Sequence, residues 1–559
     1  MHSDWIEYEP IKKEISVAEE AEKKKYRLEE VLVLFVSVEE GDNEKLAAQA
    51  IDEVSRFLKN VKVNKILIYP FAHLSNNLAK PDDALKVVKE MESQAKKLKI
   101  EVYRAPFGWN KALAIKVKAH PLAEQSKVFS ADGVKIEKKI EMKAVREIKN
   151  PMNLIKRSDF AGLSEKDHRI IGEQLDLYSF QEVGPGMVFL HPKGVILREV
   201  LIDFWRREHK KRGYQEISAP IILNNALWQV SGHWEHFKEN MFFSEIEGQG
   251  FGLKPMNCPN AILVFKSRPR SYKDLPLRFS ELGLVHRNEL SGVLSGLFRV
   301  RAFVQDDAHI FLNEKNLEKE IISIIDLVKH FYDVFGFEFS VDLSLKPEKA
   351  MGDPKIWKIG EGWLEKALKD AKIKYKKCPG EGAFYGPKID FHIKDSLGRK
   401  WQLATIQLDF VMAERFKAAY IGDDGKEHAP IIIHRVIYGA LERFMGILVE
   451  HYQGKFPVWL APVQVRVLSI SEDNMKYAKK VLRALEENEI RCEGDFESHK
   501  IEYKIRSAQL QKIPFSIVIG AKEEKANKIS IRDRNGKIRH DIELQDFIKE
   551  VKKEVADKK

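Results

Sequence analysis

Residues 255–311 bring together the side chains of this sequence that are best suited to chemistry. They include Cys258, the closely spaced pair Arg287 and Glu289, and His309. On a strand, Arg287 and Glu289 would point to one face. There a guanidinium can hold a phosphate or carboxylate while the glutamate accepts a hydrogen bond from an amine. This spacing suits a nucleotide, and a thiol with an imidazole suits a borderline metal ion such as zinc.

Alternating apolar and polar residues predict strands around this pair. After the turn SGVLSG, residues 297–304 continue as a second strand, so a hairpin is expected with Arg299 and Arg301 on a common face. Each feature alone also fits a simpler interpretation. A charged hairpin can be solvent-exposed, and a single cysteine or histidine is more often a packed, hydrogen-bonded residue than a ligand. At this level both interpretations stay open.

Longer segments carry a resemblance to a known family. They are MNCP, DLPLRFSELGLVHRNE, RVRAFVQDDAHIF, GEGAFYGPKIDF, WQLATIQLDF and HRVIYGALERFMGIL. Together and in this order they resemble the threonyl-tRNA synthetases, which are class II aminoacyl-tRNA synthetases, from about residue 167 to the C-terminus. The resemblance implies a threonine--tRNA ligase that forms threonyl-adenylate from ATP and transfers threonine to tRNA(Thr). The alternative is a synthetase-like RNA-binding protein without catalysis.

The resemblance also implies roles for individual residues. Expected ligands of one zinc ion per subunit are Cys258, His309 and His434. The expected catalytic residues are Arg287, Arg443 and Lys388. The residues expected to bind ATP, with Mg²⁺, are Arg287, Glu289, Arg299, Gln402 and Arg443. Those expected to bind threonine are Gln305, Asp307, Tyr385 and Gln407. A homodimer is implied as well.

The catalytic domain is expected over residues 165–455. Apolar residues at helical spacing predict a helix over 195–211, stopped at Gly213, and another over 317–335, closed by Gly336. A further helix is expected over 167–178. Strands are expected around 214–217 and in the segments GEGAFYGPKIDF and WQLATIQLDF. Class II resemblance implies a mainly antiparallel sheet flanked by helices.

The N-terminal residues 1–130 predict an α/β domain. Strands are expected at 31–38, 65–69 and 113–117, and helices at 43–60 and 82–98. This part resembles the editing domain of archaeal threonyl-tRNA synthetases, similar in fold to D-aminoacyl-tRNA deacylase. The resemblance implies hydrolysis of seryl-tRNA(Thr), with His73, Lys111 and Glu124 at the working positions. The strand that opens this domain in the family is expected to be missing from the sequence as written, because His2 follows Met1 directly.

Residues 131–164 are rich in lysine and predict a linker. From 456 to 559 strands and helices alternate, which predicts a small α/β domain with parallel strand pairs. It resembles the anticodon-binding domain of class II enzymes, and the resemblance places Glu523 and Arg532 at base-contacting positions. The fold class expected for the whole chain is therefore a multidomain protein of α/β and α+β parts.

Bulk composition agrees with a nucleic-acid partner. The chain has 559 residues and a formal net charge of +10, which suits a phosphate backbone such as that of tRNA. Its 3 cysteines are too few and too scattered for a disulfide framework. No secretory leader and no membrane-spanning run of apolar residues is recognised. A cytoplasmic protein without membrane association is expected.

Overall fold

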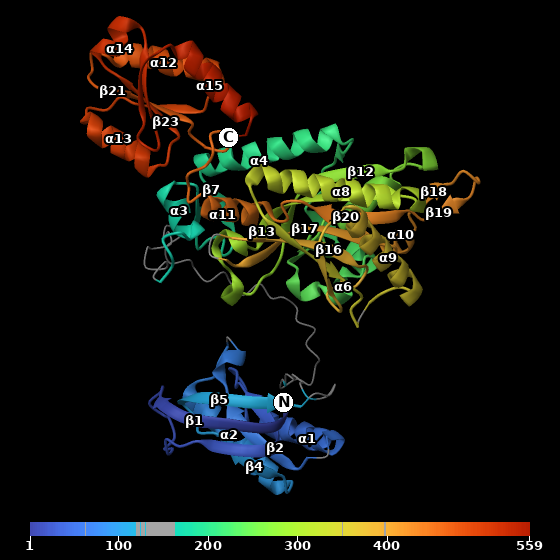
Figure 1. Cartoon of the computed structure of the whole chain (residues 1–559). Helices are drawn as coiled ribbons and strands as arrows, with labels where there is room; N and C mark the ends of the chain where they lie inside the picture. The colour runs from blue at the N-terminus through green and yellow to red at the C-terminus, as the bar shows by residue number, and fades with distance from the viewer. Residues whose placement is uncertain are drawn as a thin grey trace. The chain divides into compact units, whose positions relative to one another are not determined.

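A computed structural model of the chain describes residues 1–118, 123, 129 and 162–558. Residues 62, 76, 349, 396 and 397 and the side chains of residues 73 and 236 are outside this description. The chain divides into two compact units, Met1–Arg146 and Glu147–Lys559, which are treated separately below. Figure 1 shows both units with their elements labelled. Among the described residues, no helix is long and apolar enough to cross a membrane.

The first unit contains a five-stranded sheet in the order β4-β3-β2-β1-β5. Its elements are β1 (His2–Lys13), β2 (Tyr26–Val36), α1 (Glu44–Val61), β3 (Lys65–Pro70), the 3₁₀ turn η1 (Ala72–Leu74), α2 (Pro81–Lys97), β4 (Glu101–Arg104) and β5 (Trp109–Val117). Helices α1 and α2 pack on one face of the sheet, where Ile51 and Val88 meet Ile66 and Ile68. The expected helices and three strands are therefore confirmed, with small shifts at their ends.

Strand β1 was not predicted from the sequence. It runs antiparallel between β2 and β5 and pairs with both. Ile6 and Tyr8 point into a core that Val31 and Tyr69 also line. The alternation of Ile6, Tyr8 and Pro10 is the period-two signal that could have located it, but charged residues between them obscure it.

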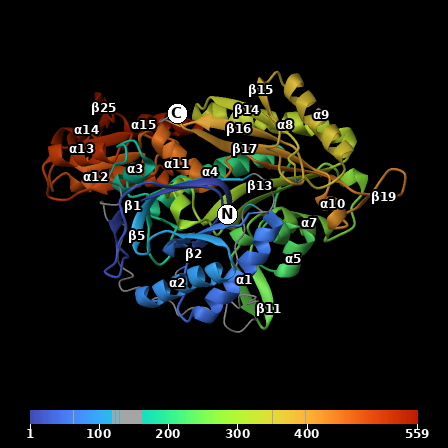
Figure 2. The ribbon, with the colours of Figure 1, turned by 90° about the horizontal axis from the view of Figure 1, so that it is seen from below.

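The second unit is built on an eight-stranded sheet in the order β15-β14-β16-β17-β20-β13-β12-β8. The strands are β8 (Gln215–Glu216), β12 (Leu277–His286), β13 (Ala302–Leu312), β14 (Phe339–Ser344), β15 (Tyr375–Cys378), β16 (Lys388–Lys394), β17 (Lys400–Asp409) and β20 (Ile431–Val436). All pairings from β14 to β12 are antiparallel, and only the two outermost pairings are parallel. The predicted antiparallel sheet is confirmed, and Figure 2 shows β14, β16 and β17 side by side.

Long helices cover one face of this sheet, and the other face carries polar side chains beside a smaller apolar cluster that includes Phe279, Phe311 and Ile432. The main helices are α4 (Pro192–Lys211), α8 (Glu314–Phe335), α9 (Pro354–Asp370) and α11 (Leu441–His451). Trp205 and Phe331 from these helices pack with Ile406 and Ile433 from the central strands. Helix α8 ends as expected at Gly336, which adopts φ 70° in the left-handed region.

Smaller elements surround the sheet. They are α3 (His168–Gln174), β6 (Tyr178–Phe180), β7 (Val188–Leu190), β9 (Ile222–Asn224), α5 (Asn225–Val230), α6 (His233–His236), η3 (Lys238–Asn240), β10 (Phe243–Ile246), β11 (Gln249–Leu253), α7 (Cys258–Lys266), η4 (Tyr272–Asp274), η5 (Ser291–Val293), η6 (Gly296–Phe298), α10 (Met412–Arg415), β18 (Tyr420–Ile421) and β19 (Glu427–His428). Two expectations are corrected here. The helix expected over 167–178 ends at Gln174, and Tyr178 instead begins β6. Residues 297–304 are not one strand, because β13 begins only at Ala302.

The C-terminal part of this unit has a second sheet in the order β22-β21-β23-β24-β25. Its elements are β21 (Val465–Ser469), α12 (Met475–Glu487), β22 (Cys492–Asp495), α13 (Ile501–Leu510), β23 (Phe515–Ile519), α14 (Ala521–Ala526), β24 (Ile529–Asp533), β25 (Ile538–Ile542) and α15 (Leu544–Ala556). Strand β21 is parallel to both β22 and β23. The predicted small sheet with parallel pairs is confirmed.

A buried carboxylate joins the sheet to the turn before α11. Asp306 on β13 accepts hydrogen bonds from the backbone N–H groups of Ile437, Tyr438 and Gly439 at 3.0, 3.0 and 2.9 Å. The indole Nε1 of Trp205 donates to the same carboxylate at 3.1 Å. An asparagine here would turn an NH₂ group toward these donors.

Replacing Asp306 with asparagine is therefore expected to lower the free energy of unfolding by about 2–4 kcal/mol, because buried donors lose their acceptor. Urea unfolding of the full chain, followed by tryptophan fluorescence, measures this change. Asp333→Asn, at an exposed position of α8, is the matched control. Equal unfolding midpoints for the two variants would show that Asp306 does not fasten this turn.

Candidate active site

A row of polar side chains crosses the open face of the large sheet. In register, Lys388 on β16 pairs with Gln407 on β17, Gln407 with His434 on β20, and His434 with His309 on β13. Side chains that are directly opposite on neighbouring strands share one face of a sheet. The alternation of each strand thus puts its apolar neighbours toward the helices and this row toward the site.

Cys258, His309 and His434 come together in this row. Cys258 begins α7, and the three potential ligand atoms all lie within 4.8 Å of one another. All three residues are buried, and the two imidazole rings meet edge to face with centroids 4.9 Å apart. Asp409 Oδ2 lies 2.8 Å from His434 Nε2, so a carboxylate orients that ring. One thiol and two imidazoles form a donor set that suits zinc and leaves a fourth position open.

Burial shapes the protonation of these groups. It raises the pKa of the Cys258 thiol well above its usual value, and the nearby carboxylates of Asp307 and Asp409 add to this effect. Burial also lowers the pKa of His309 well below its usual value, with His434 and Arg435 contributing. The imidazole of His309 is therefore neutral and able to act as a ligand.

The residues expected to hold an amino acid lie beside this group. Asp307, two residues before His309 on the same face of β13, accepts a hydrogen bond from Asn257 Nδ2 at 2.6 Å. Asn257 can approach because Gly283 has no side chain: a Cβ there would lie 2.3 Å from Asn257 Oδ1. The ring of Tyr385 is 5.5 Å from that of His434.

Two amides complete this part of the site. The side chain of Gln407 is buried, and its Nε2 has no hydrogen-bond partner among the described residues. Gln305 pairs with Gly283 of β12 and forms a bridge to Ala440. A buried amide donor beside two imidazoles and a carboxylate makes a site for a small polar ligand.

Two half-buried arginines border the site, Arg287 in the connection after β12 and Arg443 at the start of α11. Arg287 Nε donates to the carbonyl of Pro255 at 3.2 Å, and its guanidinium lies over the rings of Phe237 and Phe303 at 5.5 and 5.1 Å. Arg443, in the first turn of α11, donates from Nε to the carbonyl of Phe298 at 2.8 Å. In both cases only Nε is used for these bonds, so the outer nitrogens of each fork remain able to bind an anion.

Burial lowers the pKa of Arg443, and the positive charges of Arg287 and Arg299 lower it further. Burial also lowers the pKa of Arg287, although Asp307 and Glu289 oppose this effect. The arginines therefore repel one another, and an anion bound among them would relieve that repulsion.

The loop carrying these residues differs from the expected hairpin. Strand β12 ends at His286, so Arg287 and Glu289 lie in the connection to β13 rather than on one face of a strand. Arg299 pairs with Glu289 at 2.9 Å within this connection, and Arg301 Nε donates to the carbonyl of Glu289 at 2.9 Å. The connection folds through the turns η5 and η6, which local alternation did not predict.

Lys388 and Gln402 share a partner that was missed. Asp390 forms a close ion pair with Lys388 and accepts from Gln402 Nε2 at 2.6 Å. Ser344 Oγ donates to the same carboxylate at 2.7 Å. Asp390 lies two residues after Lys388, and this i, i+2 spacing of opposite charges on a strand could have indicated the contact.

In the first unit, Lys111 is the one expected editing residue whose side chain is described. It lies on β5, and its Nζ donates to the carbonyls of Pro106 and Trp109 at 3.1 and 2.9 Å. The ammonium lies 5.0 Å from the ring centre of Tyr69, and burial lowers the pKa of Lys111 to about 8. His73 belongs to η1, but its side chain is outside the described structure, as is the whole of Glu124.

The expected anticodon residues lie on two consecutive elements of the C-terminal part, Glu523 on α14 and Arg532 on β24. Glu523 in α14 accepts from the backbone N–H of Gly520 at 3.0 Å and from Ser530 Oγ at 2.6 Å. Arg532 follows Ser530 by two residues on β24, so both point to one face. Arg532 Nε is buried and has no hydrogen-bond partner in the described part of the chain.

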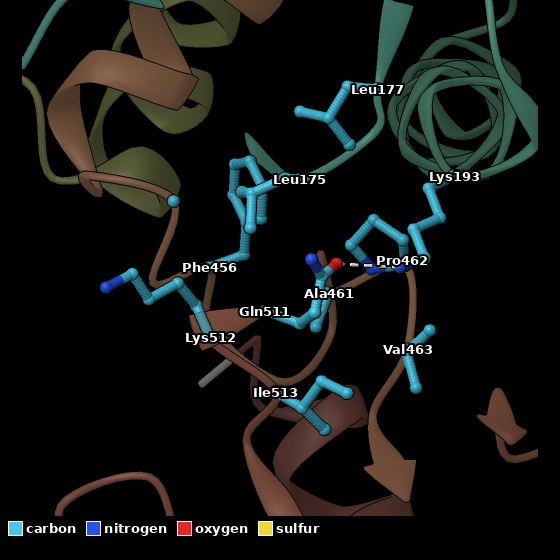
Figure 3. Close-up of a pocket in the computed structure, with 11 residues that line it drawn as sticks. Leu175, Leu177, Lys193, Phe456, Ala461, Pro462, Val463, Gln511, Lys512 and Ile513 are labelled. Atoms are coloured by element: carbon cyan, nitrogen blue, oxygen red, sulfur yellow. Dashed lines mark hydrogen bonds between the residues drawn. The ribbon is translucent and has the colours of Figure 1, made fainter. Parts of the chain in front are cut away.

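A separate hollow lies within the second unit (Figure 3). It is lined by Leu175, Leu177, Lys193, Gly454, Phe456, Ala461, Pro462, Val463, Gln511, Lys512 and Ile513. Lys193 Nζ donates to Gln511 Oε1 at 2.8 Å, and Gln511 Nε2 donates to the carbonyl of Gln174 at 3.0 Å. Gln511 thus joins the end of α13 to helices α3 and α4.

Comparison with known families places the sheet and its site in one class. Residues 242–452 match the tRNA synthetase class II core domain (G, H, P, S and T). Residues 1–129 match the archaea-specific editing domain of threonyl-tRNA synthetase, and residues 464–554 match an anticodon binding domain. The large antiparallel sheet is therefore the core of a class II aminoacyl-tRNA synthetase.

Sequence identity to individual relatives shows which family of class II synthetases the chain belongs to. A threonine--tRNA ligase of Caldanaerobacter subterraneus is 58% identical over 394 residues, which are 70% of this chain and 61% of that protein. One of Desulforamulus reducens is 54% identical over 393 residues, 70% of this chain and 62% of that protein. A crystal structure of the RNA binding domain of threonyl-tRNA synthetase from Cryptosporidium parvum is 41% identical, with a TM-score of 0.67, over 69% of this chain and 98% of that one. The chain belongs to the threonyl-tRNA synthetase family.

The match to these two ligases is partial. It spans 61% and 62% of their lengths and 70% of this chain. The N-terminal part of this chain is instead matched by the archaea-specific editing domain.

Proposed function

We propose that this chain is a threonine--tRNA ligase, which activates L-threonine with ATP to threonyl-adenylate and transfers threonine to tRNA(Thr). The observation that carries the proposal is the convergence of Cys258, His309 and His434, whose ligand atoms lie within 4.8 Å of one another. An RNA-binding protein without catalysis would have no need of a buried thiol and two imidazoles beside Arg287. Threonine-dependent exchange of pyrophosphate into ATP, with zinc and magnesium supplied, tests this function directly. No exchange would leave RNA binding as the function.

Zinc is the proposed metal, one ion per subunit, because thiolate and neutral imidazole donors suit it. Cys258, His309 and His434 would hold the ion, which when bound would supply a Lewis acid for the amino group and hydroxyl of threonine. Asp307, Gln305, Tyr385 and Gln407 are proposed to surround the amino acid. Asp307 is held by Asn257 and can also accept from a hydroxyl, so valine would leave the remaining acceptor sites of this buried carboxylate without a donor and be rejected strongly.

Serine presents a harder problem for the same site. It keeps the hydroxyl and lacks one methyl, which is worth about 1–3 kcal/mol in a pocket. A second, hydrolytic site is then needed to remove serine from tRNA(Thr). We propose that the N-terminal unit does this, with His73, Lys111 and Glu124 as working residues.

At the phosphates, the chain's own arginines are proposed to do the work. Arg287 would hold the α-phosphate and the threonine carboxylate, Arg443 the γ-phosphate, and Arg299 would add charge nearby. Glu289 would accept from the adenine amino group, with Gln402 and Lys388 near the adenylate and Mg²⁺ accompanying ATP. Fixed positive charges stabilise the extra charge at phosphorus in the transition state better than in the ground state.

Recognition of tRNA is proposed to involve Glu523 on α14 and Arg532 on β24. An arginine there can read unstacked bases on their edges, and the net charge of +10 suits a phosphate backbone. We further propose a homodimer, a cytoplasmic location, and domains over 1–130, 165–455 and 456–559 joined by a linker at 131–164.

Lys111 gives a test of the editing proposal. Replacing it with alanine is expected to slow hydrolysis of seryl-tRNA(Thr) by about 100-fold or more, because one charge that stabilises the reacting ester is lost. Charging of tRNA(Thr) with threonine should remain. Lys116→Ala, at an exposed position of the same strand, is the control.

The pH dependence of this hydrolysis provides a second readout. The pKa of Lys111 is lowered to about 8 by burial, so its ammonium is lost as pH rises through that value. We expect hydrolysis, corrected for the reaction without protein, to decline above about pH 8. A rate that instead climbs through pH 8 would contradict a role for the charged form.

A further inference from the structure

A second group of ionisable side chains is buried outside the proposed zinc site. Asp167, His168 and Glu450 have ligand-capable atoms within 4.8 Å of one another, and all three are buried. Their atoms are already used within the chain. His168 Nδ1 lies 2.8 Å from Glu450 Oε1, and His168 Nε2 accepts from the backbone N–H of Leu297 at 3.0 Å. The group is therefore a closed hydrogen-bond network and not a site for a metal ion.

The charges in this network are balanced by two arginines. Arg399 donates to Glu450 Oε2 at 2.8 Å and to Asp395 at 2.6 Å. Arg169 donates to Asp167 at 2.9 and 2.8 Å. Each buried carboxylate has a charged partner, so the network can hold a fixed geometry without an uncompensated buried charge.

His168 fastens the turn η6 to the rest of the unit. It accepts from Leu297 N–H in the middle of this turn, and the ring of Phe298 lies 4.1 Å from the imidazole ring. Gly296 precedes them with φ +48°, and a Cβ at this position would lie 2.3 Å from His168 Nε2. The close approach of the ring to the turn thus requires glycine.

The turn η6 also positions side chains that are proposed to bind ATP. The carbonyl of Phe298 accepts from Arg443 Nε at 2.8 Å. Arg299 follows directly and pairs with Glu289 at 2.9 Å. Both arginines and the glutamate are thereby linked to His168 through one short segment of backbone.

Helix α11 contacts both the turn η6 and His168. Arg443 and Glu450 are seven residues apart on this helix, which places them on the same face two turns apart. One end of the face binds Phe298 through Arg443, and the other end binds His168 through Glu450. Gly446 lies between them, where a Cβ would meet Phe298 at 3.0 Å, so helix and turn are in close contact.

We infer that His168 is a positioning residue for the ATP site: it holds η6 against α11, so that Arg443, Arg299 and Glu289 are arranged for the phosphates and the base. The inference rests on the proposed function and adds to it a residue that contacts no substrate. Without His168, Leu297 N–H loses its acceptor and η6 is released from α11, so the ATP site loosens while the zinc site on β13 and β20 does not.

The test compares Michaelis constants in pyrophosphate exchange, using the full chain with zinc and magnesium supplied. For His168→Ala the KM for ATP is expected to rise by about 10-fold or more, a typical effect of removing a residue that orients a ligand-binding group. The KM for threonine and the zinc content should stay as in the unaltered protein. A merely structural defect would lower the active fraction, and with it kcat, without changing KM.

Two further variants make the comparison decisive. His168→Gln keeps an acceptor for Leu297 N–H, so its KM for ATP should lie between the values of the alanine variant and the unaltered protein. If the alanine variant does not fold, the glutamine variant is measured in its place. His451→Ala removes a half-buried histidine from the same helix, where it packs on Phe337 at 4.8 Å, and should leave KM unchanged.

A KM for ATP within about threefold of the unaltered value in the His168 variants would overturn the inference, since a tenfold change is expected from lost orientation. Lack of exchange in the unaltered protein would instead reject the proposed ligase function. In that event the dissociation constant of ATP, measured by calorimetry on the same variants, decides the positioning role.

Discussion

Cys258→Ala is expected to remove the bound zinc and, with it, threonine-dependent pyrophosphate exchange. The thiol lies within 4.8 Å of both imidazole donors, and two histidines alone make a weak site for this ion. Mutating a residue that only orients a metal ligand typically lowers activity by about 10–100-fold. Loss of a ligand itself should therefore lower the exchange rate by about 100-fold or more. Metal content by plasma mass spectrometry and exchange at saturating ATP measure the two effects together.

Cys378→Ala is the matched control, because it removes a half-buried thiol from β15, which is an edge strand of the sheet and does not neighbour β13 or β20. It should keep both zinc and exchange. Stability gives a third readout. Cys258 is buried, so loss of the thiol alone should cost about 1 kcal/mol. A Cys258→Ala protein that is folded, free of zinc and still active in exchange would mean that the three residues do not form the threonine site.

Much of this site could be predicted from the sequence because its residues lie on regular strands. His309 and His434 are directly opposite on β13 and β20, and Gln407 is opposite His434 on β17. Strand alternation fixes which side chains share a face, so once the strands are paired the row follows. His309 and His434 were brought together by the resemblance, since two residues more than a hundred positions apart cannot be paired by local patterns.

Other features depend on contacts that local patterns do not encode. Residues 287–301 fold as two 3₁₀ turns rather than a hairpin because Arg301 donates to the carbonyl of Glu289 and His168 accepts from Leu297 N–H. Arg301 and Glu289 both belong to this connection, whereas His168 lies 129 residues before Leu297 in the sequence. His168 itself lies in the short helix α3, where a histidine is unremarkable until Glu450 and Gly296 are seen beside it.

Arg287→Gln is expected to reduce pyrophosphate exchange by about 100- to 1,000-fold, the usual cost of removing one fixed donor that stabilises a developing negative charge. The loss should fall mainly on kcat, because the α-phosphate gains charge as the adenylate forms. Exchange kinetics with ATP and threonine varied in turn measure this. Arg268→Gln, at an exposed position, is the control and should have no effect.

The stability of the same variant separates this role from a structural one. Burial lowers the pKa of Arg287, so its positive charge is held against a desolvation cost, and only Nε is bound to Pro255 among the contacts described above. A neutral glutamine should relieve that cost, and the unfolding midpoint in urea should stay equal or rise. An enzyme that becomes more stable while losing exchange would show that Arg287 is kept for the phosphate. Loss of stability in parallel with activity would assign it to the packing of Phe237 and Phe303 instead.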